Sequence, residues 1–200
     1  MSQAQFILAS SSMSRRTMLE AAGIAFTVVA PNVDEALMKD VLTGGGADAP
    51  TVAHALAEAK AIAISDRHPD ALVLGSDQIL VCEGTIFNKA LDETQARAAL
   101  RALRGCEHEL ISAAVMARGG RVVWQRTDMA RLTMREFSDA FLDWYIMAEM
   151  PDILGSVGCY RIEGRGAQLF SSVKGDHFCI RGLPLIAVLE ALRDFESLSP

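Results

Sequence analysis

A short apolar strand that leads directly into a helix is the feature of this sequence that most limits its fold. Residues 6–8 (Phe-Ile-Leu) predict a buried strand, and a helix is expected from Ser14 to Ala22. Three consecutive serines, residues 10–12, lie between them. A strand that runs into a helix N-terminus directs unpaired backbone N–H groups toward one point in space. This opening is typical of a sheet with helices packed against it.

The rest of the chain repeats this alternation. Further strands are expected at 26–29, 71–75 (continuing to 82), 86–89, 109–117, 121–134 and 167–173, and further helices at 51–66, 92–104, 138–150 and 182–195. Residues 31–35 and 43–50 are expected to be loops. The pattern predicts an α/β (mixed α+β) fold, a mixed sheet flanked by helices, with one long hairpin at residues 118–120.

Length and composition narrow the class of protein. A chain of 200 residues suits a single domain over 1–200, built as one body or as two lobes around a cleft. No apolar run is long enough to cross a membrane and no leader precedes the first strand, so we expect a cytoplasmic protein without a membrane partner. The net charge of −6 argues against nucleic acid as a partner but allows a small anionic ligand. The four cysteines show no metal-binding spacing, which predicts free thiols.

The first strand–helix turn carries a candidate anion site. Ser10 and Ser12 supply hydroxyl donors, and Arg15 supplies a planar fork that suits phosphate oxygens. The alternative is an ordinary turn in which a serine caps the helix. The sequence of the turn alone leaves both interpretations open.

A second group of candidates is charged. Asp77 follows the apolar strand 71–75, the position where α/β sheets usually meet ligands, and it could bind a metal or accept a proton from water. An Asx-turn residue is an equally good interpretation. Lys89 is expected to return close to Asp77 on the paired strand, where it could form an ordinary salt bridge. Glu35 and Lys60 by themselves suit a solvent-exposed loop and helix edge. The arginines at 97, 101 and 104 predict a solvated helix face.

Together these residues are chemically coherent. Serines and Arg15 at a helix N-terminus, two lysines and the carboxylates of Glu35 and Asp77 suit a polyphosphate bound with Mg²⁺ or Mn²⁺. Phosphoryl chemistry needs mainly positioning and charge neutralisation, which such a set can provide.

The same residues resemble the Maf family of nucleoside triphosphate pyrophosphatases, which is related in fold to the inosine triphosphate pyrophosphatases. The resemblance covers nearly the whole length. It is carried by ordered matches at 8–12 with the following arginines, 33–35, 59–61, 75–78, Lys89, 105–108, 160–166, 175–176 and 182–185. So many matches in one order are specific to the family.

The resemblance implies metal-dependent hydrolysis between the α- and β-phosphates of a nucleoside triphosphate, with Mg²⁺ or Mn²⁺ as cofactor. Asp77 would accept the proton and, with Glu35, hold the metal; Lys60 and Lys89 would complete the catalytic set. The family's phosphate-binding positions correspond here to Ser10, Ser12 and Arg15. The resemblance also implies an elongated mixed sheet, a nucleotide cleft between two lobes, and a homodimer.

Three positions bear on substrate specificity. Gln78 and Glu163 look like the branch that hydrolyses 7-methyl-GTP, because a carboxylate can accept hydrogen bonds from a guanine edge and offset a methylated, cationic ring. Ser14 fits neither this branch nor the dTTP/UTP branch, which is the alternative within the family. A rival from another class is a nucleotide-binding regulator of septum formation that does not hydrolyse its ligand. A dinucleotide-dependent oxidoreductase is disfavoured because the first turn lacks the Gly-x-Gly-x-x-Gly pattern.

Overall fold

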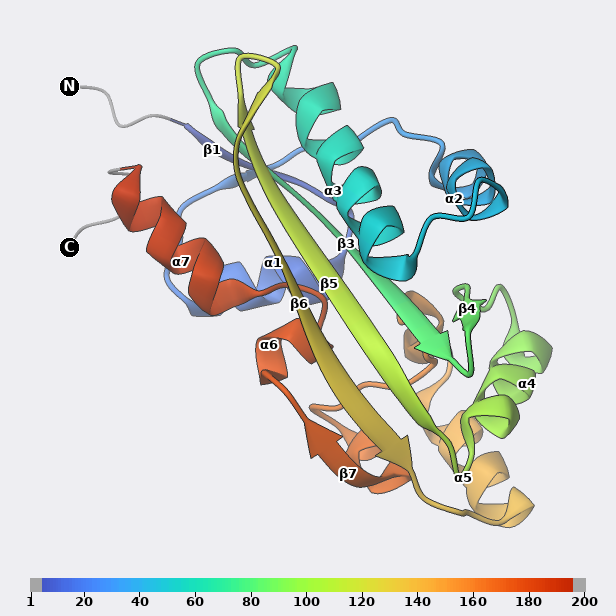
Figure 1. Cartoon of the computed structure of the whole chain (residues 1–200). Coiled ribbons are helices and arrows are strands. Elements are labelled where there is room, and N and C mark those ends of the chain that lie inside the picture. Colours follow the sequence, from blue (N-terminus) through green and yellow to red (C-terminus); the bar gives the residue numbers. More distant parts are fainter. Residues whose placement is uncertain (1–4, 196–200) are drawn as a thin grey trace. The chain divides into compact units, whose positions relative to one another are not determined.

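The computed structural model describes residues 5–195 and contains a mixed sheet flanked by helices (Figure 1). Its strands are β1 (Phe6–Ala9), β2 (Thr27–Val28), β3 (Leu72–Cys82), β4 (Thr85–Phe87), β5 (Glu107–Arg118), β6 (Arg121–Met134) and β7 (Phe170–Lys174). The seven-stranded sheet has the order β2-β1-β3-β5-β6-β7, and β4 pairs with β3. The strands β1, β2 and β3 are parallel, whereas the β3–β4 and β6–β7 pairs are antiparallel. The predicted fold class is confirmed.

The helices are α1 (Met13–Ala21), α2 (Glu35–Gly44), α3 (Ala49–Ser65), α4 (Glu93–Leu103), α5 (Asp139–Glu149), α6 (His177–Ile180) and α7 (Leu185–Asp194), with 3₁₀ turns η1 (Asp152–Gly155) and η2 (Arg165–Leu169). Four of the longer helices begin at a capping aspartate or serine where the sequence offers one: Asp34, Asp48, Asp92 and Ser138 each accept a hydrogen bond from the backbone N–H three residues on. In the described part of the chain, no helix is long and apolar enough to cross a membrane.

The chain divides into two compact units. Among the described residues, unit 1 comprises 5–78, 111–128 and 182–195, and unit 2 comprises 79–110 and 129–181. The strands β3, β5 and β6 each contribute residues to both units.

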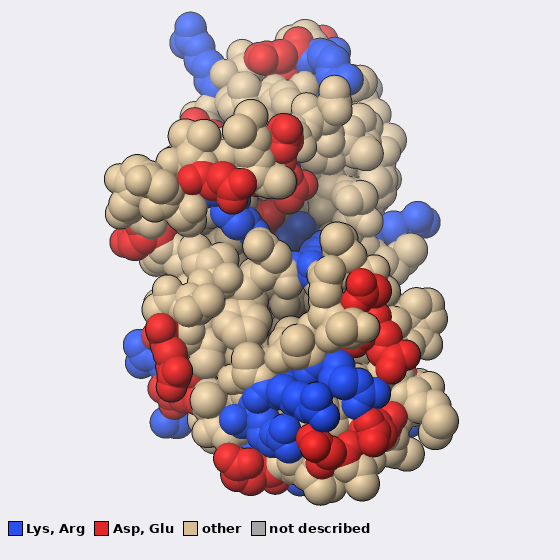
Figure 2. Space-filling model, turned by 90° about the vertical axis from the view of Figure 1, so that its right-hand side faces the viewer, with Lys and Arg blue, Asp and Glu red and all other residues tan. Residues whose placement is uncertain are grey.

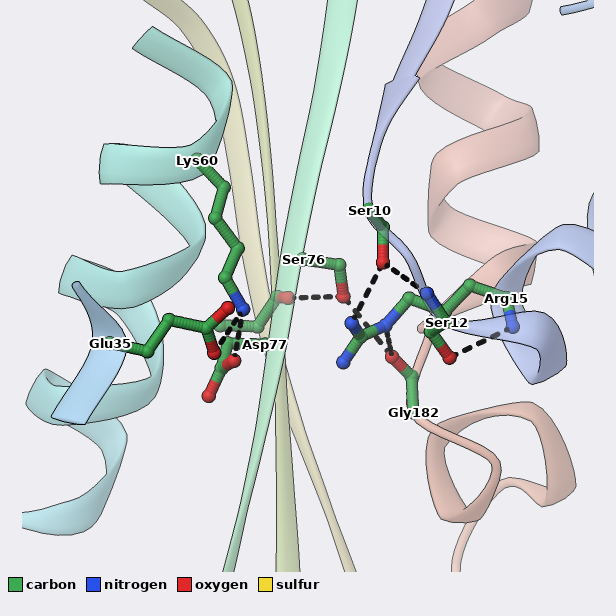
Figure 3. A network of polar contacts seen from close by, with 9 residues as sticks. Ser10, Ser12, Arg15, Glu35, Lys60, Ser76, Asp77 and Gly182 are labelled. Carbon is green, nitrogen blue, oxygen red and sulfur yellow. Dashed lines mark hydrogen bonds and ion pairs between the residues drawn. The ribbon is translucent and has the colours of Figure 1, made fainter. Parts of the chain in front are cut away.

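In unit 1, α3 covers one face of the parallel strands, and α1 and α7 cover the other (Figures 1 and 3). Gly75 on β3 allows α3 to approach closely. A Cβ at this position would lie 2.6 Å from the backbone N of Ala61 and would also overlap the carbonyl oxygen of Ala57. This close packing fixes the position of α3 along β3, and so determines which α3 side chains lie beside the residues that follow Gly75.

Unit 2 has its own apolar core, formed by its parts of β3, β5 and β6 and by α4, α5, η1, η2 and α6. The predicted arginine stripe of α4 is paired with acids of α5: Arg97 contacts Asp143, while Arg101 and Arg104 contact Asp139. Figure 2 shows one face of the molecule, on which a band of basic side chains lies beside acidic ones. The stripe is an interhelical ion-pair network as well as a solvated face, which corrects the simpler expectation.

Two local expectations were partly wrong. Residues 31–34 form a loop as expected, but α2 occupies Glu35–Gly44, so the connection expected at 43–50 is limited to residues 45–48 before α3 begins at Ala49. Residues 167–169 belong to the 3₁₀ turn η2, so the strand there begins only at Phe170. The helix α2 contains no buried residue.

Candidate functional site

The hydroxyl-rich turn after β1 forms a serine–arginine cluster, defined as Ser10, Ser12 and Arg15. Ser10 is buried, and its Oγ accepts hydrogen bonds from the backbone N of Ser12 at 3.1 Å and from Nη1 of Arg15 at 3.3 Å. A serine hydroxyl has two acceptor positions and one hydrogen. Because both acceptor positions are engaged, the hydroxyl hydrogen of Ser10 remains to be donated to an anion.

Ser12 caps α1, and its side chain accepts a hydrogen bond from the backbone N of Arg15 at 3.5 Å. The first turn of α1 contains no acidic residue, so the helix itself supplies no carboxylate to the positive end of its dipole. The capping interpretation of the turn is confirmed. It is compatible with anion binding, since the remaining N–H groups of the first turn still point out of the helix end.

Arg15 is a buried cation. Only 8% of its surface is exposed, and its Nε donates to the carbonyl oxygen of Gly182 at 2.7 Å. Burial lowers the pKa of Arg15 from its ordinary value, and the negative charges of Asp77 and Glu35 oppose this shift. A guanidinium stays protonated at physiological pH, so its buried charge favours an anionic partner.

The second group is a lysine–carboxylate cluster, defined as Glu35, Lys60 and Asp77. The Nζ of Lys60 lies 2.6 Å from Oδ1 of Asp77 and 2.8 Å from Oε2 of Glu35. The side chains of Lys60 and Asp77 are only 5% and 10% exposed, whereas that of Glu35 is half exposed. Lys60 therefore does not lie on a solvated helix edge, the interpretation that its sequence position suits when taken alone. It lies on the buried face of α3, between Ala57 and Ala61, the two residues that contact Gly75.

Strand β3 passes between the two clusters (Figure 3). Asp77 points toward α3, and the neighbouring residue Ser76 points to the opposite face, where its Oγ donates to the carbonyl oxygens of Ala113 at 2.7 Å and Gly182 at 3.1 Å. Successive side chains of a strand alternate between the two faces of a sheet. Asp77 therefore lies inside β3 and not after it as expected, and the two clusters lie on opposite faces of this strand, just past the point where its parallel pairing with β1 ends, within unit 1.

The donor set fits a hard divalent cation. Mg²⁺ is usually held by one or two carboxylates together with substrate phosphate oxygens, rather than by a complete cage of protein ligands. Glu35 and Asp77 are two carboxylates that both reach one cation, Lys60 Nζ. Within residues 5–195 there is no group of three or more His, Cys, Asp or Glu side chains suited to a metal. A metal here would need further oxygen ligands from a bound ligand or from water.

The remaining predicted residues lie as follows. Gln78, at the end of the unit 1 segment of β3, donates from Nε2 to Oγ of Ser112 at 3.1 Å. Ser14 lies in the first turn of α1 and is partly exposed. Lys89 and Glu163 belong to unit 2: Lys89 is exposed and follows β4, and Glu163 pairs with Arg181 at 3.7 Å. The roles assigned to these four residues remain predictions.

Sequence reasoning gave no role to Ser76 or Gly182. Ser76 could have been noticed, because a polar residue beside Asp77 in a buried strand needs a hydrogen-bond partner. Gly182 carried no comparable signal, since a glycine before Leu-Pro reads simply as the start of a helix. Its contact with Arg15 joins residues 167 positions apart in the chain.

The site lies where the parallel pairing of β1 with β3 ends. It combines a capped helix N-terminus, a buried arginine and two carboxylates that contact one lysine. These features define an α/β protein with a site for an anionic ligand. The comparison with known families is more specific. The family model described as "Maf-like protein" matches residues 5–195, and the chain belongs to this family.

Curated relatives match along almost the whole chain. A protein of Granulibacter bethesdensis named nucleoside triphosphate pyrophosphatase is 47% identical over 98% of this chain and 99% of its own length. A protein of Paramagnetospirillum magneticum with the same name is 49% identical over 97% of this chain and 100% of its own length. A protein of Rhizobium meliloti named 7-methyl-GTP pyrophosphatase is 43% identical over 94% of each chain.

Proposed function

We propose that this protein is a nucleoside triphosphate pyrophosphatase, a hydrolase that cleaves the bond between the α- and β-phosphates and releases the nucleoside monophosphate and pyrophosphate. The observation that carries the proposal is the buried contact of Lys60 with Asp77 at 2.6 Å, which Glu35 completes at 2.8 Å. Membership of the Maf family and the names of the relatives that match over almost the whole chain support the same activity.

Each cluster has a part in the proposed reaction. Ser10, Ser12 and Arg15 bind phosphate oxygens with a hydroxyl, a helix N-terminus and a guanidinium. Asp77 accepts the proton of the attacking water, and its contact with Lys60 holds the carboxylate in one orientation. Lys89 adds a further cation from unit 2.

We also propose that Mg²⁺ or Mn²⁺ is the cofactor, held by Glu35 and Asp77 together with oxygens of the substrate. When bound, such an ion neutralises phosphate charge and polarises the bond to be broken. The protein's own part is to keep the two carboxylates on one side of β3 through their contacts with Lys60.

For the base, we propose 7-methyl-GTP as the preferred substrate, with dTTP or UTP as the alternative. Glu163 and Gln78 are the residues assigned to the base, and relatives named 7-methyl-GTP pyrophosphatase are 41–43% identical to this chain. A homodimer, a nucleotide cleft between two lobes and a cytoplasmic location belong to the same proposal.

Pyrophosphate release from a panel of nucleotides tests the activity. Purified protein with Mn²⁺ is given 7-methyl-GTP, GTP, dTTP and UTP, and Asp77→Asn is compared with wild type. Asp77→Asn is expected to retain nucleotide binding and to lose about 10³-fold in kcat. Asp70→Asn, at an exposed aspartate just before β3, is the matched control and should keep full activity.

The rival proposal, a regulator that binds nucleotide without hydrolysing it, predicts binding but no pyrophosphate. A regulator also has no need for a carboxylate held beside a buried lysine. Absence of pyrophosphate from every nucleotide would refute the enzyme, and unchanged turnover in Asp77→Asn would remove Asp77 from the reaction.

A further inference from the structure

One backbone carbonyl joins the serine–arginine cluster to strand β3. The carbonyl oxygen of Gly182 accepts a hydrogen bond from Nε of Arg15 at 2.7 Å and another from Oγ of Ser76 at 3.1 Å (Figure 3). All three groups are buried, and Ser76 has no exposed surface. Ser76 has one hydroxyl hydrogen, which it shares between this carbonyl and the nearer carbonyl oxygen of Ala113 at 2.7 Å, so the contact with Gly182 is the longer branch of a bifurcated hydrogen bond.

We propose that Ser76 and the Gly182 carbonyl act as positioning groups that hold the Arg15 guanidinium for phosphate binding, an inference that rests on the proposed function. Ser76 is fully buried, so it does not touch a ligand and acts through the groups that it contacts. It is a positioning residue and not a catalytic one.

The geometry explains how the guanidinium is fixed. Arg15 has five N–H donors in one plane. The Nε–H is held by Gly182, and one N–H of Nη1 is directed to Ser10. With two points of the plane fixed, the orientation of the remaining donors is fixed as well. Those donors include both hydrogens of Nη2. A guanidinium held in one orientation loses less conformational entropy on binding a phosphate than a mobile one does.

The backbone at Gly182 is adapted to this task. Its φ of +97° lies in the region that side-chain-bearing residues rarely adopt. A Cβ at this position would lie 3.5 Å from Nη2 of Arg15, in ordinary van der Waals contact. Glycine is therefore required by the backbone conformation that aims the carbonyl, and not by lack of space.

The hydroxyl of Ser76 keeps that carbonyl in place from the side of β3. It has one hydrogen for two carbonyl oxygens, Ala113 O on β5 and Gly182 O before α7. Removal of the hydroxyl releases the Gly182 carbonyl from the strand, and Arg15 then moves with it. The effect of Ser76 on phosphate binding should consequently depend on Arg15.

A double-mutant cycle tests this dependence. The four proteins are wild type, Ser76→Ala, Arg15→Lys and the double variant, and the probe is inorganic pyrophosphate in Mg²⁺ buffer, with its Kd measured by calorimetry. Arg15→Lys keeps the charge but lacks Nε–H and the planar fork. We expect Kd to rise about fivefold in Ser76→Ala and about thirtyfold in Arg15→Lys. The double variant should match Arg15→Lys within about twofold.

Steady-state kinetics with the preferred nucleotide give a second readout. Ser76→Ala should raise KM by a similar factor with kcat nearly unchanged, whereas a displaced Asp77 would lower kcat. Ser65→Ala is the matched control: Ser65 is equally buried in unit 1, and its hydroxyl accepts a hydrogen bond from the backbone N of Gly120. This control should leave Kd and KM at wild-type values. If Ser76→Ala does not fold, Ser76→Cys keeps the volume with a much weaker donor.

Additive effects of Ser76→Ala and Arg15→Lys, or an unchanged Kd in Ser76→Ala, would overturn the inference. So would a wild-type protein that does not bind pyrophosphate, because Arg15 would then have no phosphate to hold. A wild-type protein that binds pyrophosphate but hydrolyses no nucleotide would refute the proposed function alone, and the cycle would still decide the role of Ser76.

Discussion

The buried His108 in unit 2 makes the stability of this protein depend on pH in a calculable way. His108 is 1% exposed, and its Nε2 lies 2.8 Å from the hydroxyl of Tyr160. Burial lowers the pKa of His108 from 6.5 to about 4, against a smaller opposing effect of the Cys106 backbone. Burial also raises the pKa of Tyr160, so both partners are neutral at physiological pH.

The direction of the pH effect follows from the protonation of His108 in the folded and the unfolded protein. The folded protein keeps His108 neutral down to about pH 4, whereas the unfolded chain takes up a proton below pH 6.5. The contribution of His108 to the free energy of unfolding is therefore complete above pH 6.5 and is lost as the pH falls toward 4. Within this window, each unit by which the pH falls lowers the free energy of unfolding by about 1.4 kcal/mol. Between about pH 7.5 and about pH 5 the loss comes to about 2 kcal/mol.

Urea unfolding followed by circular dichroism at these two pH values measures the loss. When the pH falls from about 7.5 to about 5, the free energy of unfolding should drop by about 2 kcal/mol more in wild type than in His108→Gln, which has no group that titrates at this position. The comparison uses the change between the two pH values, so a fixed effect of the substitution and the titration of other groups both cancel.

Tyr160→Phe is the matched control. It removes the hydroxyl beside His108 but leaves the ring buried, and burial is the main cause of the shift. It should keep the pH dependence of wild type. If His108→Gln loses as much stability as wild type between the two pH values, the reasoning from burial is refuted.

Three further predictions concern the site. Gly75→Ala should lower the free energy of unfolding by about 3 kcal/mol, because the new Cβ meets the backbone of α3; a change below about 0.5 kcal/mol in urea unfolding would contradict this packing. Glu163→Gln should shift the kcat/KM ratio of 7-methyl-GTP to dTTP by about tenfold toward dTTP, and an unshifted ratio would count against its role with the base. Mn²⁺ should raise the Tm of wild type but not that of a variant with both Glu35→Gln and Asp77→Asn; equal shifts would place the metal elsewhere.

The sequence predicted those parts of the fold that a local pattern determines. The strand–turn–helix at the N-terminus, the apolar start of β3 and the glycine turn of the β5–β6 hairpin appear where expected. The helix α2 was not predicted, although Leu37 and Val41 have helical spacing in the sequence; in the structure they are 60% and 65% exposed and face no core. Its N-terminus is capped by Asp34, a local signal that was interpreted only as an acidic loop.

The candidate site was predictable as a set of residue types but not as two clusters. Arg15 and Asp77 were expected in one charged site, because serines, arginine, lysines and carboxylates suit a polyphosphate. The side of β3 on which each residue lies was not predicted. The burial of Arg15, Lys60 and Asp77 was not predicted either. Lys60 is covered because α3 packs tightly over Gly75, and that contact depends on tertiary structure.

The alternation of β3 explains why neighbouring residues of one strand serve different clusters. Gly75 and Asp77 face α3, and Ser76 faces Arg15 and the Gly182 carbonyl. A register shift of one residue would exchange the two faces and would place a carboxylate beside Gly182 O, where it could donate no hydrogen bond. The parallel pairing of Ala9 with Gly75 fixes the register two residues before Asp77 and one residue before Ser10. The same pairing that buries the apolar start of β3 therefore also sets which cluster each polar residue joins.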